Sequence, residues 1–350
     1  MPPEKAKKNG RKPTVADVAR LAGVGTATVD RVLNERSNVS DEVRRKVIDA
    51  AREIGLRRVL PRSYRPMLNV NLILARPELP LLQTMSKEFR IIARNARDFL
   101  SLHVTTVPDE SPQHVAEAML ATKCDGVVVY AQEAPEIRQA IATLHERKIP
   151  VVTMISDIKT SRRLAYAGTD HFAAGRSAAY FLGKMLPQGG SIVVLCNHLG
   201  FEAHAERVSG FRAYIADHAP QLALGRLVEG LDDRIRSRAR LEAAFREVPD
   251  TVAVYNVGAA NLGVRAAIEK DILPQRPLFV GHELTNHTAK MLRDGVMTLA
   301  IDQSPRLQAQ FAIDVLLDHF GYEDSHVSKP YKSNVPLVLY GPEYIPPGFD

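Results

Sequence analysis

Near the N-terminus of the chain, apolar residues recur every three or four positions in three short stretches separated by polar turns. This spacing places the apolar side chains on one face of an α-helix. Three helices are therefore predicted within residues 14–55, and a small bundle can bury their apolar faces together. The predicted buried positions are Val15, Val18, Ala19 and Ala22 in the first helix, Val29, Val32 and Leu33 in the second, and Val43, Val47, Ala50, Ala51 and Ile54 in the third.

The residues at the ends of these stretches are typical of helix ends. Thr14 precedes the first helix and Asp17 stands three residues later, which is the spacing of a capping box. Gly23 ends that helix, Ser40 can cap the third, and Gly55 stands where a left-handed residue is favoured. The first two helices are thus predicted to be joined by a tight turn.

From Val70 onward, short apolar runs alternate with amphipathic stretches of helical period. Such alternation predicts βαβ units and a parallel sheet. The first series has the strands VNLILA, HVTTV, GVVVYA and PVVTMI, with helices near 83–100, 113–122 and 135–147. The second has helices near 172–186, 204–218, 236–247, 259–270 and 286–294, with the strands SIVVLC, 226–229, VAVYNV and LFVGHE.

The two series predict an α/β core of two doubly wound parallel-sheet subdomains behind the three-helix head. A strand-like segment at 297–301, a helix near 305–320 and NVPLVLY at 334–340 allow the chain to cross between the halves more than once. We expect a head over 12–57, a linker over 58–69 and a core over 70–345. Within the core, residues 70–168 with 302–330 form one subdomain, and residues 169–301 with 331–345 form the other.

Composition is that of a globular protein, because 45% of the residues are hydrophobic and 25% are charged. No run approaches the ~20 apolar residues that span a bilayer, and no apolar segment follows the basic start MPPEKAKKNGRKP. The sequence therefore predicts neither a signal peptide nor a membrane anchor. Cys124 and Cys196 each stand in an apolar run, which favours buried free thiols in a reducing compartment. We expect a cytoplasmic protein.

The positive charge is concentrated in the head and linker. Residues 1–66 contain 16 Lys and Arg against 8 Asp and Glu, whereas residues 67–350 contain 30 against 32. A small basic unit joined to a nearly neutral body indicates a binding surface for a polyanion.

The second predicted helix has a polar outer stripe opposite its apolar one. A helix, a tight turn through glycine and a second helix of this kind form a helix-turn-helix, whose second helix enters the major groove of DNA. Thr26, Ala27 and Thr28 are small enough for the helix backbone to approach the DNA. Arg31 could donate to guanine or phosphate, and Asn34 to a base edge or phosphate. Spacing alone leaves a generic three-helix bundle as the alternative.

The segment TVADVARLAGVGTATVDRVLNERSNVSDEVRRKVIDAAREIG resembles the DNA-binding head of the LacI/GalR family of bacterial transcription regulators. It carries the DVA, AGV, TV-RVLN and VS-x-x-x-R-x-K-V elements at that family's spacing. The rest of the chain resembles the family's periplasmic-binding-protein-like core, so the resemblance covers about residues 12–345. One helix-turn-helix reads too few bases for useful specificity, so we expect a homodimer that binds a pseudo-palindromic operator. The resemblance favours a repressor over an activator.

The resemblance also implies roles for single residues of the head. Thr26, Ala27 and Arg31 match base-reading positions. The residues at or near phosphate-contacting positions are Thr14, Thr28, Asp30 and Asn34.

Two positions depart from the family pattern. Asp30 stands where the family commonly has serine, and because phosphate would repel it, we expect it to accept from a cytosine amino group or to pair with a local arginine. The linker LRRVLPRSYRPML replaces the hinge pattern Y-x-P-N-x-x-A-R-x-L, and Pro61 and Pro66 argue against an ordinary hinge helix. Leu60 is the candidate for a residue that wedges into the minor groove.

Polar residues at the predicted strand ends mark a cleft between the two core subdomains. The family resemblance matches Arg207, Asn256, Glu283 and Gln303 to ligand positions, although Asp is commoner where Glu283 stands. Donors and acceptors of this kind suit a sugar, a polyol or a sugar acid, and two arginines could equally hold a carboxylate or a phosphate. The predicted effector-binding residues are Arg76, Tyr130, Asp157, Arg207, Asn256, Glu283 and Gln303.

Catalytic signatures are weak. The sequence lacks G-x-G-x-x-G after the first core strand, G-x-x-x-x-G-K-[ST], G-x-S-x-G and H-E-x-x-H. His198, Glu202 and His204 lack the further partner that a metal site needs. We therefore predict a regulator with no catalytic residue, metal or cofactor. The alternatives are a sugar- or nucleotide-handling enzyme with an accessory DNA-binding domain and an architectural DNA-binding protein without an effector.

Overall fold

The computed structural model describes residues 13–34, 39–54, 56, 67–322 and 335–349. They belong to a small N-terminal unit, called the head, and a large unit that begins at Leu68, called the core. The predictions made for Gly55, Leu60, Pro61 and Pro66 lie outside the described residues.

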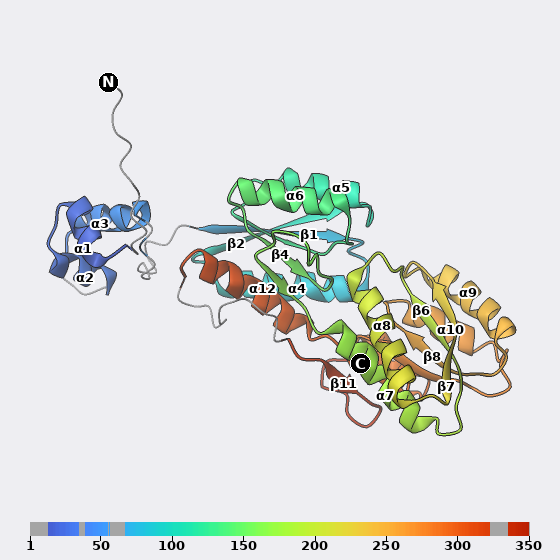
Figure 1. Cartoon of the computed structure of the whole chain (residues 1–350). Helices are drawn as coiled ribbons and strands as arrows, with labels where there is room; N and C mark the ends of the chain where they lie inside the picture. Colours follow the sequence, from blue (N-terminus) through green and yellow to red (C-terminus); the bar gives the residue numbers. More distant parts are fainter. Residues whose placement is uncertain (1–12, 35–38, 55, 57–66, 323–334, 350) are drawn as a thin grey trace. The chain divides into compact units, whose positions relative to one another are not determined.

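The head contains three helices, α1 (Val15–Ala22), α2 (Thr26–Leu33) and α3 (Asp41–Glu53) (Figure 1). The capping box is confirmed, because the Thr14 amide donates to Asp17 Oδ2 at 2.9 Å and the Asp17 amide donates to Thr14 Oγ1 at 3.4 Å. Gly23 ends α1 with a φ of 66°, a left-handed conformation that glycine adopts without steric strain. The tight turn between α1 and α2 follows from it.

One apolar cluster holds the three helices of the head together. The predicted inner face of α2 is confirmed, since Val29, Val32 and Leu33 are all buried. Ile48 of α3 is also buried, although the helical spacing did not single it out. The buried members of the cluster are Val18, Ala19, Val29, Val32, Leu33, Val47, Ile48, Ala50 and Ala51.

The core has two lobes, each built on its own sheet. The first lobe has a five-stranded sheet in the order β2-β1-β3-β4-β5, with every neighbouring pair parallel. Its strands are β1 (Leu68–Ala75), β2 (Leu100–Val107), β3 (Gly126–Val129), β4 (Val151–Met154) and β5 (Ala165–Ala167), and its helices are α4 (Pro80–Asn95), α5 (Pro112–Leu120) and α6 (Pro135–Glu146).

Helices cover both faces of this first sheet. Alternate residues of a strand point to opposite faces, so Ile73, Val127 and Val129 pack against α5 and α6. The other face is covered by α4 and by α12 (Pro305–His319), which returns to this lobe after the second sheet (Figure 1). A Cβ atom on Gly126 of β3 would lie only 3.1 Å from Leu316 of α12, so the two elements are in close contact.

The second lobe has a six-stranded sheet in the order β11-β10-β9-β8-β6-β7. All neighbours are parallel except β10 and β11, which are antiparallel. Its strands are β6 (Gly190–Cys196), β7 (Leu222–Glu229), β8 (Thr251–Asn256), β9 (Leu278–His282), β10 (Leu299–Asp302) and β11 (Val338–Tyr340), and its helices are α7 (His171–Met185), α8 (Glu202–His218), α9 (Arg234–Glu247), α10 (Asn261–Ile268) and α11 (Asn286–Arg293).

The two sheets share one topology, because β7-β6-β8-β9-β10 repeats the order β2-β1-β3-β4-β5. In such sheets the direction of winding reverses beside the first strand, and ligands bind at the carboxyl ends of the strands next to that point. The predicted fold of two doubly wound parallel-sheet subdomains is confirmed. The loops that follow β1, β3, β6 and β8 are therefore the expected place for a ligand site.

Three element boundaries differ from the sequence prediction. The helix expected near 83–100 is α4, which begins at Pro80 and ends at Asn95, so β2 begins earlier than HVTTV. The strand expected at 226–229 is the eight-residue β7, an edge strand whose exposed residues weaken its apolar pattern. The short strand β5 was not predicted, because three residues are too few to show alternation.

Across the described ranges, no helix combines the length and the apolar character that a bilayer crossing requires.

Candidate functional site

The outer face of α2 carries the side chains predicted to meet DNA. Thr26, Ala27, Arg31 and Asn34 are exposed, whereas Val29, Val32 and Leu33 on the other face are buried. Thr28 and Asp30 are half-buried at the edges of this face. The helix therefore offers a short polar surface on a rigid support.

The start of α2 is open. Gly25 precedes the helix and has no side chain to cap the amides of the first turn. Such amides, at the positive end of a helix dipole, are suited to a phosphate oxygen. Thr14 has a structural role, because its hydroxyl donates to Asp17 Oδ2 at 2.6 Å within the capping box of α1.

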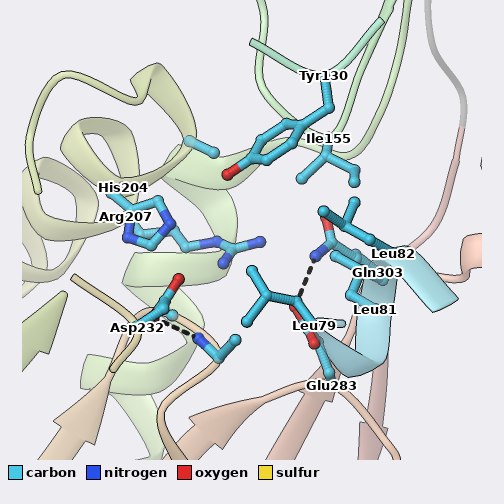
Figure 2. Close-up of a pocket in the computed structure, with 13 residues that line it drawn as sticks. Leu79, Leu81, Leu82, Tyr130, Ile155, His204, Arg207, Asp232, Glu283 and Gln303 are labelled. Carbon is cyan, nitrogen blue, oxygen red and sulfur yellow. Dashed lines mark hydrogen bonds between the residues drawn. The ribbon is translucent and has the colours of Figure 1, made fainter. Parts of the chain in front are cut away.

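In the core, a pocket of about 410 Å³ lies between the carboxyl ends of the strands of the two lobes (Figure 2). This volume includes space open to solvent, and the enclosed part is about 30 Å³. Its lining comes from loops after strands and from the first turns of α4 and α8. The lining residues are Leu79, Leu81, Leu82, Tyr130, Ile155, Ala203, His204, Arg207, Asp232, Gly258, Ala259, Glu283 and Gln303.

Four of the seven predicted effector-binding residues line this pocket: Tyr130, Arg207, Glu283 and Gln303. Arg76, Asp157 and Asn256 are not among the lining residues. The pocket also contains residues that the sequence did not point to, chiefly His204, Asp232 and the aliphatic side chains Leu79, Leu81, Leu82 and Ile155.

Arg207 is held by the close crossing of α7 and α8. A Cβ on Gly175 would lie 1.9 Å from the Arg207 carbonyl oxygen, and a Cβ on Gly210 would lie 2.0 Å from the carbonyl oxygen of Phe172. Both positions therefore require glycine. The crossing places Arg207 in the pocket with only 2% of its surface exposed.

The guanidinium of Arg207 is only partly satisfied. Nε donates to Nδ1 of His171 at 3.2 Å, and Nη1 donates to the carbonyl oxygen of Val257 at 2.7 Å. Nη2 is buried without a hydrogen-bond partner. Figure 2 shows the guanidinium pointing into the cavity. It is the pocket's open cationic donor.

Asp232 and His204 are both oriented by Asn197. Oδ1 of Asp232 accepts from the Ala259 amide at 2.8 Å, and Oδ2 accepts from Asn197 Nδ2 at 3.2 Å. Nδ1 of His204 accepts from the Asn197 amide at 3.3 Å, so Nε2 carries the ring proton. Burial and the nearby Arg207 lower the pKa of His204 to about 3, which keeps the ring neutral. His204 is thus a neutral donor and acceptor.

Glu283 follows β9 and is buried, with Oε1 accepting from Gln303 Nε2 at 3.4 Å. Burial raises the pKa of Glu283 to about 8, against the opposing effect of Arg207 and with a contribution from Asp232. At neutral pH the carboxyl is therefore mostly protonated, and it can donate as well as accept a hydrogen bond.

The three predicted residues outside the lining are engaged within the protein. Asp157 pairs with Arg163 and accepts from the Ile158 amide at 2.8 Å, so its carboxylate has a structural partner. Asn256 Nδ2 donates to Asn261 Oδ1 at 2.7 Å and to the carbonyl oxygen of Gly258 at 3.0 Å, which shapes the loop under the pocket. Arg76 Nη1 donates to a carbonyl of the other lobe, that of Leu231.

The loops around the pocket contain non-glycine residues with positive φ. Ile155, Asp232 and Glu283 line the pocket with φ values of 64°, 49° and 73°. Arg76 and Leu231 lie beside it with values of 50° and 55°. Such conformations are unfavourable, most of all for the β-branched Ile155, and they gather at ligand sites. The loops around the pocket therefore contain several locally unfavourable backbone conformations.

Sequence signals for the missed residues were slight. His204 stands out in HLGFEAH only as a possible metal ligand, and the described parts of the chain contain no group of His, Cys, Asp or Glu that could hold a metal ion. Asp232 follows the edge strand β7, whose end was not predicted as a cleft position. The leucines at the start of α4 read as ordinary core residues.

Comparison with known proteins matches two family models to this chain. Residues 14–58 match bacterial regulatory proteins of the lacI family, and residues 84–323 match the periplasmic binding protein domain. The second match alone covers more than half of the chain.

Individual proteins agree with these matches. The transcriptional regulator GalR of Salmonella typhimurium is 25% identical over 221 residues, which is 59% of this chain and 60% of GalR. The transcriptional repressor PurR of Glaesserella parasuis is 24% identical over 346 residues, which is 95% of this chain and 96% of PurR. The chain spans about half to three fifths of the length of several other curated relatives that it matches.

Among solved structures, the core is similar to GanP, a glucose-galactose binding protein from Geobacillus stearothermophilus. The TM-score is 0.73 at 19% identity, covering 81% of this chain and 100% of GanP. At this identity the similarity shows the fold alone. With a lacI-type head that has its helix-turn-helix geometry and a core that matches the periplasmic binding protein model, the chain belongs to the LacI family of bacterial regulatory proteins.

Proposed function

We propose that this chain is a sequence-specific DNA-binding transcriptional regulator, acting as a cytoplasmic homodimer and as a repressor, whose operator affinity is set by a small polar effector in the core pocket. The observation that carries the proposal is the buried Arg207, whose Nη2 lacks a partner, in a chain that also has an exposed recognition face on α2. The first feature supports a ligand in the pocket, and the second supports DNA binding by the head.

The DNA-binding part of the proposal rests on the outer face of α2. Thr26, Ala27 and Arg31 would meet base edges in the major groove. Asn34 and the amides at the start of α2 would meet the phosphate backbone. One head of this size contacts too few base pairs for useful specificity, so two heads are expected to bind a pseudo-palindromic site.

The effector part rests on the two-sided lining of the pocket. Tyr130 and Ile155 come from the first lobe, and Arg207 and Asp232 come from the second. A ligand that touches both lobes stabilises the arrangement in which they are closed. If the operator binds one arrangement of the lobes more tightly, effector binding and operator binding are linked. The effector then changes the affinity for the operator, and the operator changes the affinity for the effector.

Selection of binding sites from a random duplex DNA pool by the full chain tests the proposal. We expect a pseudo-palindromic consensus, bound at nanomolar to micromolar concentrations by a species that sediments as a dimer. Failure to enrich any consensus, or a monomer with and without the selected DNA, would contradict the DNA-binding part. The effector part requires that a sugar, polyol or sugar acid change the dissociation constant of that DNA.

Two alternatives are separated by simple measurements. An enzyme with an accessory DNA-binding domain would convert the ligand, and we expect no turnover of any ligand that binds. An architectural DNA-binding protein would need no effector, so a thermal-shift screen of sugars, polyols and sugar acids without any stabilisation would favour it.

A further inference from the structure

The unpaired cation in the pocket indicates the charge of the ligand. Arg207 is buried, and no carboxylate in the described part of the chain lies within 4.0 Å of its guanidinium. Asp232 lies near enough for the charge of Arg207 to oppose the rise in the pKa of its carboxyl that burial causes, but Nη2 still lacks a hydrogen-bond partner, and a buried donor without one is unfavourable. An anion from outside the protein would supply the missing partner at Nη2.

A second positive feature meets the same cavity. The first turn of α4 lines the pocket through Leu81 and Leu82, and Figure 2 shows this turn across the cavity from Arg207. The N-cap residue Leu79 makes no side-chain cap, and Pro80 has no N–H. The amides of Leu81 and Leu82 are thus first-turn donors at the positive end of a sixteen-residue helix.

The acids in the pocket oppose an added anion less than their number suggests. Both oxygens of Asp232 already accept hydrogen bonds, from Ala259 and Asn197. Glu283 is faced by Arg207, Asp232, Asp302 and the Tyr130 hydroxyl, and burial raises its pKa to about 8. At neutral pH its carboxyl is mostly uncharged and can donate a hydrogen bond to a ligand.

We propose that the pocket binds a sugar acid, a polyhydroxylated monocarboxylate whose carboxylate lies between Arg207 Nη2 and the first-turn amides of α4. The hydroxyl groups would then meet His204, Gln303 and Glu283. A phosphate dianion fits less well, because Arg207 is the one cationic side chain among the described lining residues and Asp232 faces the same space. The proposal rests on the proposed function of this pocket as the effector site and names the class of effector.

Titration calorimetry on the full chain with matched pairs tests the proposal: D-gluconate against D-glucitol, D-galacturonate against D-galactose, and D-glucuronate against D-glucose. We expect at least one acid to bind ten-fold or more tightly than its neutral partner and more tightly than D-glucose 6-phosphate. A neutral sugar or the phosphate binding as tightly as every acid would overturn the proposal while leaving the effector function intact. Absence of binding by the whole panel would overturn both.

The pH profile gives an independent readout on the unmodified protein. The acid should bind equally well at pH 6 and pH 7, and its affinity should fall above pH 8 by up to ten-fold per pH unit as Glu283 ionises beside it. A neutral sugar, which can donate its hydroxyls to ionised Glu283, would show no such fall. A flat profile for the acid therefore contradicts the proposal.

Two variants locate the effect. Arg207→Gln should weaken acid binding at least ten-fold more than Arg212→Gln, which removes the same charge from an exposed position on α8. Glu283→Gln should bind the acid more tightly than the unmodified chain at pH 9, because it removes the charge that forms there. If Arg207→Gln does not fold, Glu283→Gln decides, and an unchanged affinity at pH 9 would count against the proposal.

Discussion

Arg76 Nη1 donates a hydrogen bond of 2.8 Å to the main-chain carbonyl oxygen of Leu231, and this bond joins the first lobe of the core to the second. The Arg76 guanidinium also lies 3.9 Å from Glu110 and 3.0 Å from Glu78. Leu231 directly precedes Asp232, which lines the pocket. Arg76 therefore supports the loop that forms one wall of the pocket, although it is not itself a lining residue.

Other contacts between the lobes surround this bond. Asn197 Nδ2 donates to Glu110 Oε2 at 3.3 Å, and the Ala203 amide donates to Ser156 Oγ at 3.3 Å. The ring of Tyr130 stacks on that of Phe201 with a centroid distance of 5.0 Å. The lobes are thus joined on several sides of the pocket in this structure.

Replacing Arg76 by alanine should weaken effector binding by roughly ten-fold, the equivalent of about 1.4 kcal/mol, because the closed arrangement loses one bond between the lobes. Calorimetry with a ligand found in the screen measures this loss. Arg90→Ala, on the exposed side of α4, is the matched control and should bind normally. Equal affinities for the two variants would show that the Arg76 bond does not support the binding-competent state.

Replacing Arg31 by alanine should abolish the preference for the selected operator, because a bidentate contact to a base contributes ~1–3 kcal/mol of discrimination. Fluorescence anisotropy with specific and scrambled duplexes measures the preference. Arg45→Ala removes the same charge from an exposed position on α3 and should lower both affinities more evenly. Retained specificity in Arg31→Ala would mean that α2 is not the recognition helix.

Replacing Asp30 by serine should change which operator is preferred more than whether DNA is bound. Asp30 is half-buried beside exposed Arg31, where a carboxylate can accept from a cytosine amino group. Repeating the site selection with the variant should give an altered consensus. Glu42→Ser on α3, which removes the same charge, should keep the original consensus. An unchanged consensus with Asp30→Ser, together with tighter binding, would indicate that Asp30 only repels phosphate.

Acid should destabilise the core through three buried histidines. Burial and the nearby Arg207 lower the pKa values of His171 and His282 well below 6.5 and that of His204 to about 3. The unfolded chain therefore binds protons below about pH 6.5 that the folded chain does not, and stability falls as pH falls. Urea unfolding should give a lower free energy of unfolding at pH 5 than at pH 6. This difference should be about 1.4 kcal/mol smaller in His204→Gln than in the unmodified chain.

The control for that measurement is His103→Gln, since His103 is exposed on β2. It should leave the difference between pH 6 and pH 5 unchanged. A His204→Gln variant with the full decrease would mean that the His204 ring is protonated in the folded protein.

Glu283 should lower the stability of the ligand-free protein as pH rises. Its pKa is raised from 4.5 to about 8, so between these values the unfolded chain ionises while the folded chain does not. Relative to the unmodified chain, Glu283→Gln should gain about 1.4 kcal/mol of stability per pH unit over this window and nothing more above pH 8. Urea unfolding at pH 5, 6 and 7 measures this trend, and exposed Glu146→Gln should show none.

Local patterns predicted the head closely and the core in outline. The caps at Thr14 and Gly23 and the buried face of α2 depend on contacts within a few residues, and the structure has them as predicted. The parallel α/β order also follows from the alternation of apolar runs and helices. The prediction was wrong where the local signal is weak: the edge strand β7 is longer than predicted, and the three-residue β5 was missed.

The sequence by itself determined most of the elements of this protein, the outer face of α2, and the strand ends from which Tyr130, Glu283 and Gln303 reach the cleft. Only the tertiary structure decided that Asp157 and Asn256 are hydrogen-bonded to neighbouring side chains and that Arg76 joins the lobes. It also decided that His204 and Asp232 line the pocket. The reason is that helix periodicity and strand order place backbones, whereas the partner of a buried polar side chain depends on loops that meet from distant parts of the chain. Arg207 shows both contributions, because its helix was predictable from the sequence, whereas the close crossing of α7 and α8 at Gly175 and Gly210 and the unsatisfied Nη2 are seen only in the structure.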